Sequence, residues 1–453
     1  LFDQPNLKAT VAWDIEVPSG WVAVANGPSG DSAEGSGRAV APGAGERERF
    51  RFQPSRPIPT YLFAFAAGQF QVEEARRGRF RMRMYHRETD SASVARNRDA
   101  IFDLHLTALE WLEAYTGIEY PFQKFDFVLI PPFQYGGMEH PGAVTYRQSS
   151  LMLDESATQS QLLGRASLIA HETAHMWFGD LVTMNWFDDV WTKEVFANFM
   201  AAKIVHPSFP DVDHDLRFLL AHHPRAYGVD RTAGANPIRQ PLDNLREAGT
   251  LYGAIIYQKA PLVMAQLERT VGEEAFRDGL RRYLAEFAYG NATWPELIEI
   301  LDRESEEDLA QWSRVWVEEP GRPTIRIERG ADRDGGGAVT ISQHDGWNRG
   351  RVWPQTLELV GSWDRKLERT EVRLGEAPAA VDAWDGRPPA DWILPMGRGI
   401  EYGLFLLDDA AYAALTLELQ GLEDPRLRGA AWLVLHDAVL EERMEPEALL
   451  ELA

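Results

Sequence analysis

A run of helix-breaking residues, Glu319-Pro320-Gly321-Arg322-Pro323, most limits how this chain can fold. Proline removes a backbone donor and glycine loosens the backbone, so neither a helix nor a central strand is expected to pass through it. Hydrophobic residues mostly follow a helical period before this run and alternate as in β-strands after it. With 453 residues the chain is also too long for one hydrophobic core. We therefore expect a multidomain α+β protein with a domain boundary here.

The hydrophobic pattern divides the chain into four expected domains. They are an N-terminal β domain at residues 1–85, a mainly helical domain at 86–320, a small β-sandwich at 321–405 and the beginning of a C-terminal helical domain at 406–453. Residues 27–46 are rich in Gly, Ser, Ala and Pro. Because strand-like sequence resumes at residue 49, this stretch is expected to be a mobile hairpin loop inside the first domain.

Within the second domain, apolar periodicity predicts a set of helices and one strand. The helices are expected near residues 101–112, 162–178, 190–205, 261–271, 274–288 and 295–301. The strand is expected at residues 125–130, before a loop that is rich in Pro and Gly.

Composition narrows the expected partners and chemistry. The formal net charge is −23, so nucleic acid and anionic membranes should be repelled and are not expected as partners. There is no cysteine, which excludes disulfides, thiolate zinc sites and cysteine catalysis. No apolar run approaches the ~20 residues of a membrane span. We expect a cytoplasmic protein, and secretion stays open because a removed signal would not be seen.

Two histidines stand four residues apart in His171-Glu172-Thr173-Ala174-His175, which has the H-E-x-x-H pattern. Four helical residues leave an offset of about 40°, so both imidazoles project from one face and can reach one ion. Glu172 lies about 100° around the helix from His171 and can approach a water without being a ligand. The alternative is a pair of core histidines, since Leu168 and Phe178 share their face.

A third candidate ligand, Glu194, follows His175 by 19 residues. It shares a mainly apolar predicted helical face with Trp191, Val195 and Asn198. An ionised carboxylate on such a face needs a cation, which a metal held by the two histidines would supply. Gly179 is expected to end the first helix, so that the second can return alongside it. A salt bridge from Glu194 to a lysine or arginine is the alternative.

Two histidines and one carboxylate leave a fourth coordination position open, which is typical of catalytic zinc. We therefore expect one zinc ion, Zn²⁺, at His171, His175 and Glu194. Zinc lowers the pKa of water to about 7, and Glu172 would take that proton as general base and pass it to the leaving group.

Residues 171–194 resemble the gluzincin zinc aminopeptidases related to aminopeptidase N. The shared features are H-E-x-x-H, 18 intervening residues and a Glu within W-x-x-E-x-F-A. Other similar segments are Tyr135-Gly136-Gly137-Met138-Glu139-His140, Ala143-Val144-Thr145-Tyr146-Arg147, Tyr257-Gln258-Lys259, residues 59–65 and residues 1–9. The resemblance is strong from residue 1 to about residue 320. We expect a bacterial member of this family.

The resemblance implies a thermolysin-like catalytic domain at residues 86–320 and peptide substrates with a free N-terminus. Glu139 would bind the α-ammonium of the substrate, and Tyr257 would donate a hydrogen bond to the oxyanion. The other implied substrate-binding residues are Met138, Gly136 and Gly137. A solvated loop acid and a core tyrosine are the alternatives for Glu139 and Tyr257. Tyr252 competes with Tyr257 but lacks the lysine two residues later.

The chain also departs from the family pattern. His140 stands in place of an Asn, and Ala260-Pro261 stand in place of Gly-Ala. Pro261 suits the first turn of a helix, which places Tyr257 just before its N-terminus. The start of the family's first domain and most of its last helical domain are expected to be absent, so a missing fragment of the same polypeptide is an expected partner.

Two other functions stay open at the sequence level. One is an epoxide hydrolase of the same fold, since Gly136-Gly137 is also found in that branch. The other is a catalytically inactive scaffold that binds peptides. Among the remaining histidines, the adjacent His222-His223 pair is expected to cap a helix or to face solvent.

Overall fold

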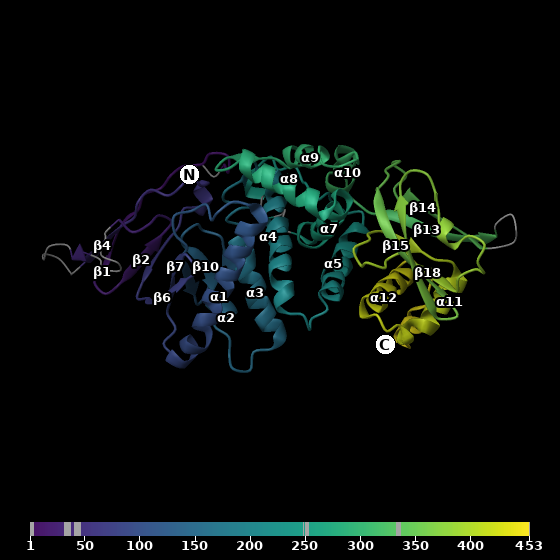
Figure 1. Ribbon diagram of the computed structural model, residues 1–453, viewed down its shortest axis with the longest axis horizontal. Coiled ribbons are helices and arrows are strands. Elements are labelled where there is room, and N and C mark those ends of the chain that lie inside the picture. The colour runs from purple at the N-terminus through teal and green to yellow at the C-terminus, as the bar shows by residue number, and fades with distance from the viewer. Residues whose placement is uncertain are drawn as a thin grey trace. The chain divides into compact units, whose positions relative to one another are not determined.

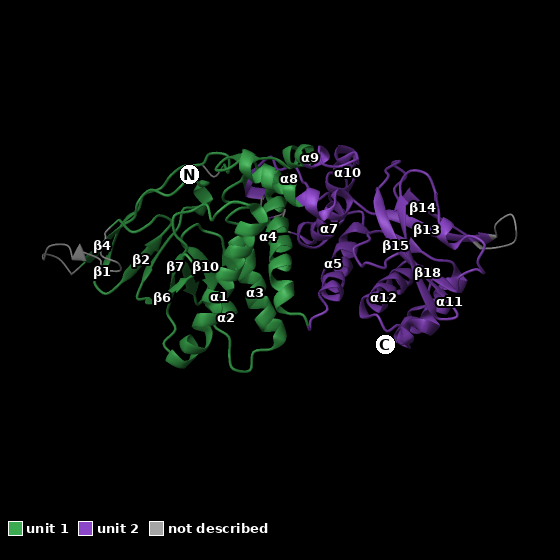
Figure 2. Cartoon of the chain, in the orientation of Figure 1, with its two compact units in different colours: residues 1–210, 277–300 green, residues 211–276, 301–453 purple. Residues whose placement is uncertain are grey.

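The computed structural model describes residues 4–30, 38–39, 47–247, 249, 253–331 and 337–452 (Figure 1). Most of the expected hairpin loop at 27–46, residues 1–3 of the family resemblance, and Tyr252 lie outside these ranges. The chain forms two compact units, shown in different colours in Figure 2. The first unit consists of Leu1–Pro210 and Arg277–Ile300, and the second of Asp211–Phe276 and Leu301–Ala453. The expected α+β class is confirmed, and the division into four domains stays a prediction.

The central sheet of the first unit has five strands. Their order is β6 (Gln71–Arg77), β7 (Phe80–His86), β8 (Phe127–Ile130), β10 (Val144–Arg147) and β9 (Gly137–Met138). Strands β7, β8 and β10 run parallel, whereas β6 and β9 are antiparallel to their neighbours. The strand expected at 125–130 is thus confirmed as β8. Because β7 pairs with β8, the sheet continues across the boundary expected at residue 85.

Smaller sheets complete the strands of the first unit. A three-stranded sheet has the order β1 (Asp14–Pro18), β4 (Arg47–Arg51) and β3 (Arg38–Ala39). Two further sheets have two strands each. In one, β2 (Val22–Ala25) pairs with β5 (Phe65–Gly68), and in the other β11 (Thr183–Met184) pairs with β12 (Asn291–Ala292). The N-terminal segment is fixed through Lys8, whose Nζ donates hydrogen bonds of 3.0 Å to the carbonyls of Asp180 and Leu181. This attaches it to the loop that follows the H-E-x-x-H residues.

The helices of the first unit begin where local capping favours them. They are α1 (Ser91–Thr116), α2 (Gln148–Leu151), α3 (Gln159–Ala174), α4 (Val190–Val205) and most of α8 (Glu273–Glu286) and α9 (Trp294–Asp302). Thr158 and Gln161 form a capping box at the start of α3. Gly117 ends α1 in the left-handed conformation, with φ of 69°. A helix is present in each range that was expected to be helical in this part of the chain, but the one expected at 162–178 ends at Ala174.

The expectation that Gly179 ends α3 is wrong. The helix ends at Ala174, with His175 as its C-cap residue. The N–H groups of Asp180 and Leu181 bond to carbonyls five residues earlier, at 3.0 and 3.1 Å. After the helix the chain therefore forms a wider turn, in which the carbonyl oxygens of His175 and Met176 accept these hydrogen bonds.

The second unit contains helices and two β-sheets. Its helices are α5 (His214–Asp230), α7 (Ala260–Val271), α10 (Leu309–Val317), α11 (Asp409–Glu418), α12 (Pro425–Leu440) and α13 (Pro446–Leu450), with a π-helical turn at Ile255–Lys259. One sheet has the order β17 (Ala379–Ala380), β14 (Gly337–Asp345), β13 (Pro323–Ala331) and β19 (Leu404–Leu406), and the other β16 (Lys366–Leu374), β15 (Gln355–Trp363) and β18 (Trp392–Leu394).

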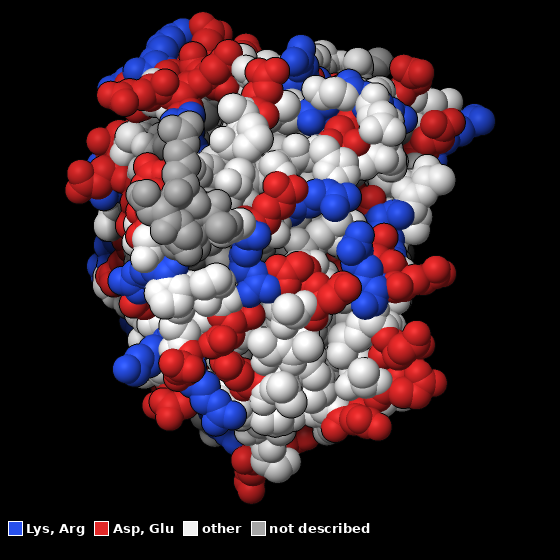
Figure 3. Space-filling model, turned by 90° about the vertical axis from the view of Figure 1, so that its right-hand side faces the viewer, with Lys and Arg blue, Asp and Glu red and all other residues white. Residues whose placement is uncertain are grey.

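One hydrophobic core spans both sheets and the helices that follow them. It contains Ile341 of one sheet, Leu357 of the other, and Leu415 and Leu435 of α11 and α12, all fully buried. The break expected at residues 319–323 is confirmed, because α10 ends at Val317 and β13 begins at Pro323. On the face drawn in Figure 3, acidic and basic side chains are interspersed. Within the described ranges, no helix combines the length and apolarity that a membrane crossing needs.

Candidate metal centre

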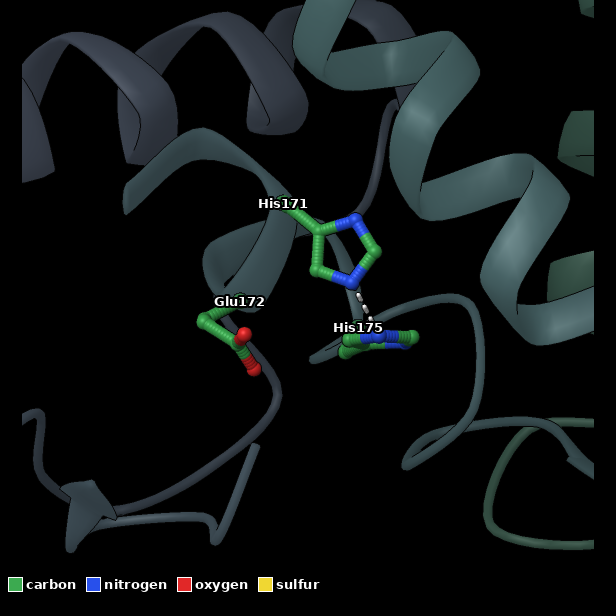
Figure 4. A group of neighbouring side chains, drawn as sticks. All are labelled: His171, Glu172 and His175. Carbon is green, nitrogen blue, oxygen red and sulfur yellow. Dashed lines mark hydrogen bonds between the residues drawn. The ribbon is translucent and has the colours of Figure 1, made fainter. Parts of the chain in front are cut away.

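The last turn of α3 brings three chemically active side chains together. His171, Glu172 and His175 place one potential ligand atom each within 4.8 Å of one another (Figure 4). The two Nε2 atoms of the histidines are 3.1 Å apart, and their rings stand almost perpendicular, at 88°. Two nitrogens bound to one tetrahedral zinc ion at ~2.05 Å would lie about 3.3 Å apart. The spacing of these two histidines therefore fits a shared zinc ion.

The opposite ring nitrogens fix the tautomers. His171 Nδ1 lies 3.0 Å from Asn198 Oδ1, and His175 Nδ1 lies 3.1 Å from the carbonyl oxygen of Phe178. Both partners are acceptors, so each Nδ1 donates its hydrogen and each Nε2 keeps its lone pair. Burial, together with the neighbouring His175, lowers the pKa of His171 to about 4. A neutral imidazole with a free Nε2 is the state that binds a metal.

Helix α4 supplies the third expected ligand. Glu194 Oε2 lies 3.7 Å from His171 Nε2, and its side chain is only 12% exposed. The chain reaches this arrangement because α4 packs against the end of α3, where Phe178 stacks on Phe196 with ring centroids 5.1 Å apart. Two imidazoles and one carboxylate thus converge from two elements.

A buried lysine that sequence reasoning missed lies beside these residues. Lys193 Nζ is 2.5 Å from Glu139 Oε1 and 3.3 Å from Glu194 Oε1, with 8% of its side chain exposed. The ion pair considered as the alternative for Glu194 is therefore present together with the approach to His171. The sequence feature that could have indicated this buried lysine is its place next to Glu194 in a mainly apolar helix. Trp191 and Phe196 of the same helix are buried as well.

The three acids of the site differ in their electrostatic surroundings. Burial alone would raise the pKa of Glu139 and of Glu194, but the ammonium of Lys193 holds both pKa values below their usual range. Burial raises the pKa of Glu172 well above its usual range, and the charges of Glu139 and Glu194 raise it further. Glu172 is thus the acid of this group that takes up a proton most readily.

Strand β9 lies at the end of its sheet and passes close to Glu172. Met138 and Gly137 pair with Thr145 and Tyr146 of β10. A Cβ atom at Gly137 would lie 2.3 Å from Glu172 Oε1, which is closer than any real contact. Glycine is therefore required where the strand backbone meets the acid. At Gly136 a Cβ would lie 3.3 Å from Leu168 Cδ1, a much milder contact.

Replacing Gly137 with alanine should lower the melting temperature, because either β9 or the carboxylate of Glu172 has to move. Overpacking of this kind costs about 1–3 kcal/mol, and thermal unfolding measures it. Gly164→Ala in α3 is the control, since its Cβ meets nothing within 4 Å and should leave stability equal or slightly higher. Equal melting temperatures for Gly137→Ala and the unchanged chain would contradict this account.

The other residues singled out by the sequence are placed as follows. Glu139 directly follows β9 and is 3% exposed, so the solvated loop acid is excluded. His140 Nδ1 lies 3.3 Å from Thr145 Oγ1. Tyr257 belongs to the second unit, in the π-helical turn directly before α7, as Pro261 indicated. His223 is fully buried with Nε2 3.0 Å from the carbonyl of Glu401, so the expectation of a capping or solvent-facing histidine is wrong there.

Comparisons with known proteins agree with these motifs. Residues 101–316 match the family model described as Peptidase family M1 domain. Aminopeptidase N of Streptomyces lividans is 32% identical over an alignment that covers 98% of this chain and 52% of that protein. Puromycin-sensitive aminopeptidase of Caenorhabditis elegans is 32% identical, covering 64% of this chain and 31% of that protein. Leucyl aminopeptidase of Saccharolobus solfataricus is 35% identical over an alignment that covers 49% of this chain and 28% of that protein. The chain spans about half or less of these relatives.

Proposed function

We propose that the chain is a member of peptidase family M1, whose model matches residues 101–316, and that it is a zinc-dependent aminopeptidase that hydrolyses the N-terminal bond of peptides. The observation that carries this proposal is the convergence of His171, His175 and Glu194, with Glu172 beside them and Glu139 buried nearby. The finer proposal for the fold is a thermolysin-like catalytic domain at 86–320, followed by a β-sandwich at 321–405.

His171, His175 and Glu194 would hold one zinc ion. When bound, zinc supplies a Lewis acid that polarises the scissile carbonyl and lowers the pKa of a water to about 7. Asn198 and the carbonyl of Phe178 would orient the two imidazoles through their Nδ1 hydrogens, at 3.0 and 3.1 Å.

Glu172 would act as the general base. Its raised pKa suits a carboxylate that takes a proton from the attacking water and then delivers it to the leaving amine. Gly137 supports this role, because only a residue without a side chain lets the backbone of β9 approach the Glu172 carboxylate.

Glu139 would bind the α-ammonium group of the substrate. Lys193 keeps the carboxylate of Glu139 ionised, because its ammonium lies 2.5 Å from Oε1 and holds the pKa low. A negative charge fixed here favours peptides whose N-terminus is charged, so the enzyme would be an exopeptidase. Gly136, Gly137 and Met138 would bind the substrate backbone along the edge of β9, and Met138 would contact the first side chain.

Tyr257 would donate a hydrogen bond to the oxyanion that forms when water attacks the carbonyl. Its place in a π-helical turn supports a functional role, because such turns are frequent at functional sites and rare elsewhere.

The test is hydrolysis of a short peptide and of its N-acetylated form. We expect cleavage of the free peptide, loss of cleavage with a chelator and recovery with added zinc. The acetylated peptide should be resistant, because Glu139 then has no ammonium group to bind. Equal cleavage of both peptides would mean that the protein is not an aminopeptidase, and absence of cleavage with a retained affinity for peptides would favour the inactive scaffold.

A further inference from the structure

The second unit contains a lysine without exposed surface. Lys259 is 0% exposed and ends the π-helical turn that carries Tyr257. Its Nζ lies 2.7 Å from Asp230 Oδ2 and donates a hydrogen bond of 2.8 Å to the carbonyl of Gly321. Removing an ammonium group from water costs several kcal/mol, whereas an apolar side chain of similar volume would fill the space without that penalty. The buried charge of Lys259 therefore indicates a role other than filling space in the core.

Helix α5 lies against the π-helical turn at two places. Asp230, its last residue, pairs with Lys259 at the end of the turn. His222, eight residues earlier in the helix, lies beside the backbone of Tyr257 and the side chain of Gln258. Burial lowers the pKa of His222 to about 4, so this contact is made by a neutral ring. Helix α5 therefore lies next to Tyr257 and also supplies the acid that pairs with Lys259.

A tyrosine completes the surroundings of the ion pair. Tyr402, fully buried, donates a hydrogen bond of 3.0 Å to Asp230 Oδ2, and its ring centroid lies 5.6 Å from Lys259 Nζ. Lys259 is therefore fixed by Asp230, by the face of Tyr402 and by the carbonyl of Gly321, where the chain turns from α10 to β13.

The geometry points to the Lys259–Asp230 ion pair as a positioning device for Tyr257, and this inference rests on the proposed function. A π-helical turn holds one residue more than an α-helical turn and is intrinsically less stable. Relaxation to an α-helix would rotate the residues before Lys259 by about 100°. Tyr257 would then point in a different direction. Anchoring Lys259 keeps the extra residue in the turn and the hydroxyl of Tyr257 in place.

The test compares Tyr257→Phe with the double variant Lys259→Met/Asp230→Asn. The double variant avoids leaving a buried carboxylate unpaired, and asparagine still accepts from Tyr402. We expect Tyr257→Phe to lower kcat about 10²–10³-fold, as loss of one oxyanion donor does. The double variant should lower kcat about ten- to a hundredfold by misplacing that donor, with KM changed by less than about twofold. Adding Tyr257→Phe to the double variant should lower kcat much less than it does in the unchanged chain.

A second buried ion pair in the same unit is the matched control. Arg322 Nη1 lies 2.7 Å from Asp437 Oδ2, and each side chain is 5% exposed. Arg322→Met/Asp437→Asn should lower the melting temperature to a similar extent and leave kcat unchanged. Amide hydrogen exchange at residues 255–259 should accelerate in the Lys259 double variant and not in the control.

The outcomes separate this inference from the proposed function. If Tyr257→Phe lowers kcat but the Lys259 double variant does not, the positioning role is wrong and the proposed function stands. If both ion-pair variants lose kcat equally, the loss comes from lower stability of the unit, and the positioning role is also wrong. If Tyr257→Phe keeps full kcat, the role of Tyr257 falls, and the inference falls with it.

Discussion

Replacing Glu172 with glutamine should lower kcat for a short peptide by about 10²–10⁴-fold while the bound zinc stays at one ion per chain. Glutamine has nearly the same shape, but its amide cannot take a proton from water. Glu172 is not among the three expected ligands, which are His171, His175 and Glu194, so metal binding should persist. Steady-state kinetics and metal analysis of the purified variant measure the two effects separately.

A matched control shows whether the effect belongs to the site. Glu155, just before α3, has a side chain that is 87% exposed, and Glu155→Gln should leave kcat unchanged. Loss of zinc from Glu172→Gln would mean that this residue is a ligand and that its role has been misassigned. Full activity with zinc retained would show that another group serves as the base.

Replacing Lys193 with methionine should destabilise the first unit of the zinc-free protein by about 3–5 kcal/mol. Glu139 and Glu194 are both buried and share the ammonium of Lys193, at 2.5 and 3.3 Å. Without it, two carboxylates are left in a buried place with no lysine between them. For a unit of this size the loss corresponds to a fall in melting temperature of roughly 6–20 °C, measurable by calorimetry.

A second substitution tests the cause of this loss. Lys193→Met/Glu139→Gln removes one of the two uncompensated charges, so it should be more stable than Lys193→Met alone. Lys203→Met in the same helix is the control, because Lys203 is only half-buried and lies 5.0 Å from the ring centroid of Phe199. If Lys193→Met unfolds at the temperature of the unchanged chain, the ion pairs do not stabilise the site.

The residues expected to bind zinc could be found from the sequence because their relationships are local. The spacing of His171 and His175 fixes their shared face within one helix, and α3 brings their Nε2 atoms to 3.1 Å. The bounds of α4 coincide with the expected helix, since residues 190–205 have no internal breaker. Glu194 could be placed because an acid on that face needed a cation.

What the sequence could not predict depends on distant or context-dependent contacts. Lys193 and Glu139 are 54 residues apart, and only the tertiary structure makes them partners. Helix α5 was not among the expected helices, since Pro224 lies inside it and it carries several polar residues. The chain after α3 is held by backbone hydrogen bonds between residues five positions apart, and no capping residue in the sequence indicates such bonds.

The path of the chain through the first unit has a consequence for biosynthesis. Residues 277–300 return to this unit, where Thr183 N donates to the carbonyl of Gly290, and Trp294 packs on Trp191 of α4 with ring centroids 4.7 Å apart. A nascent chain that has emerged only as far as Pro210 therefore carries every zinc-binding candidate but lacks the strand and the indole that complete their surroundings. The ribosome must deliver about ninety further residues before the first unit is complete, so the order of translation delays the assembly of the surroundings of these residues.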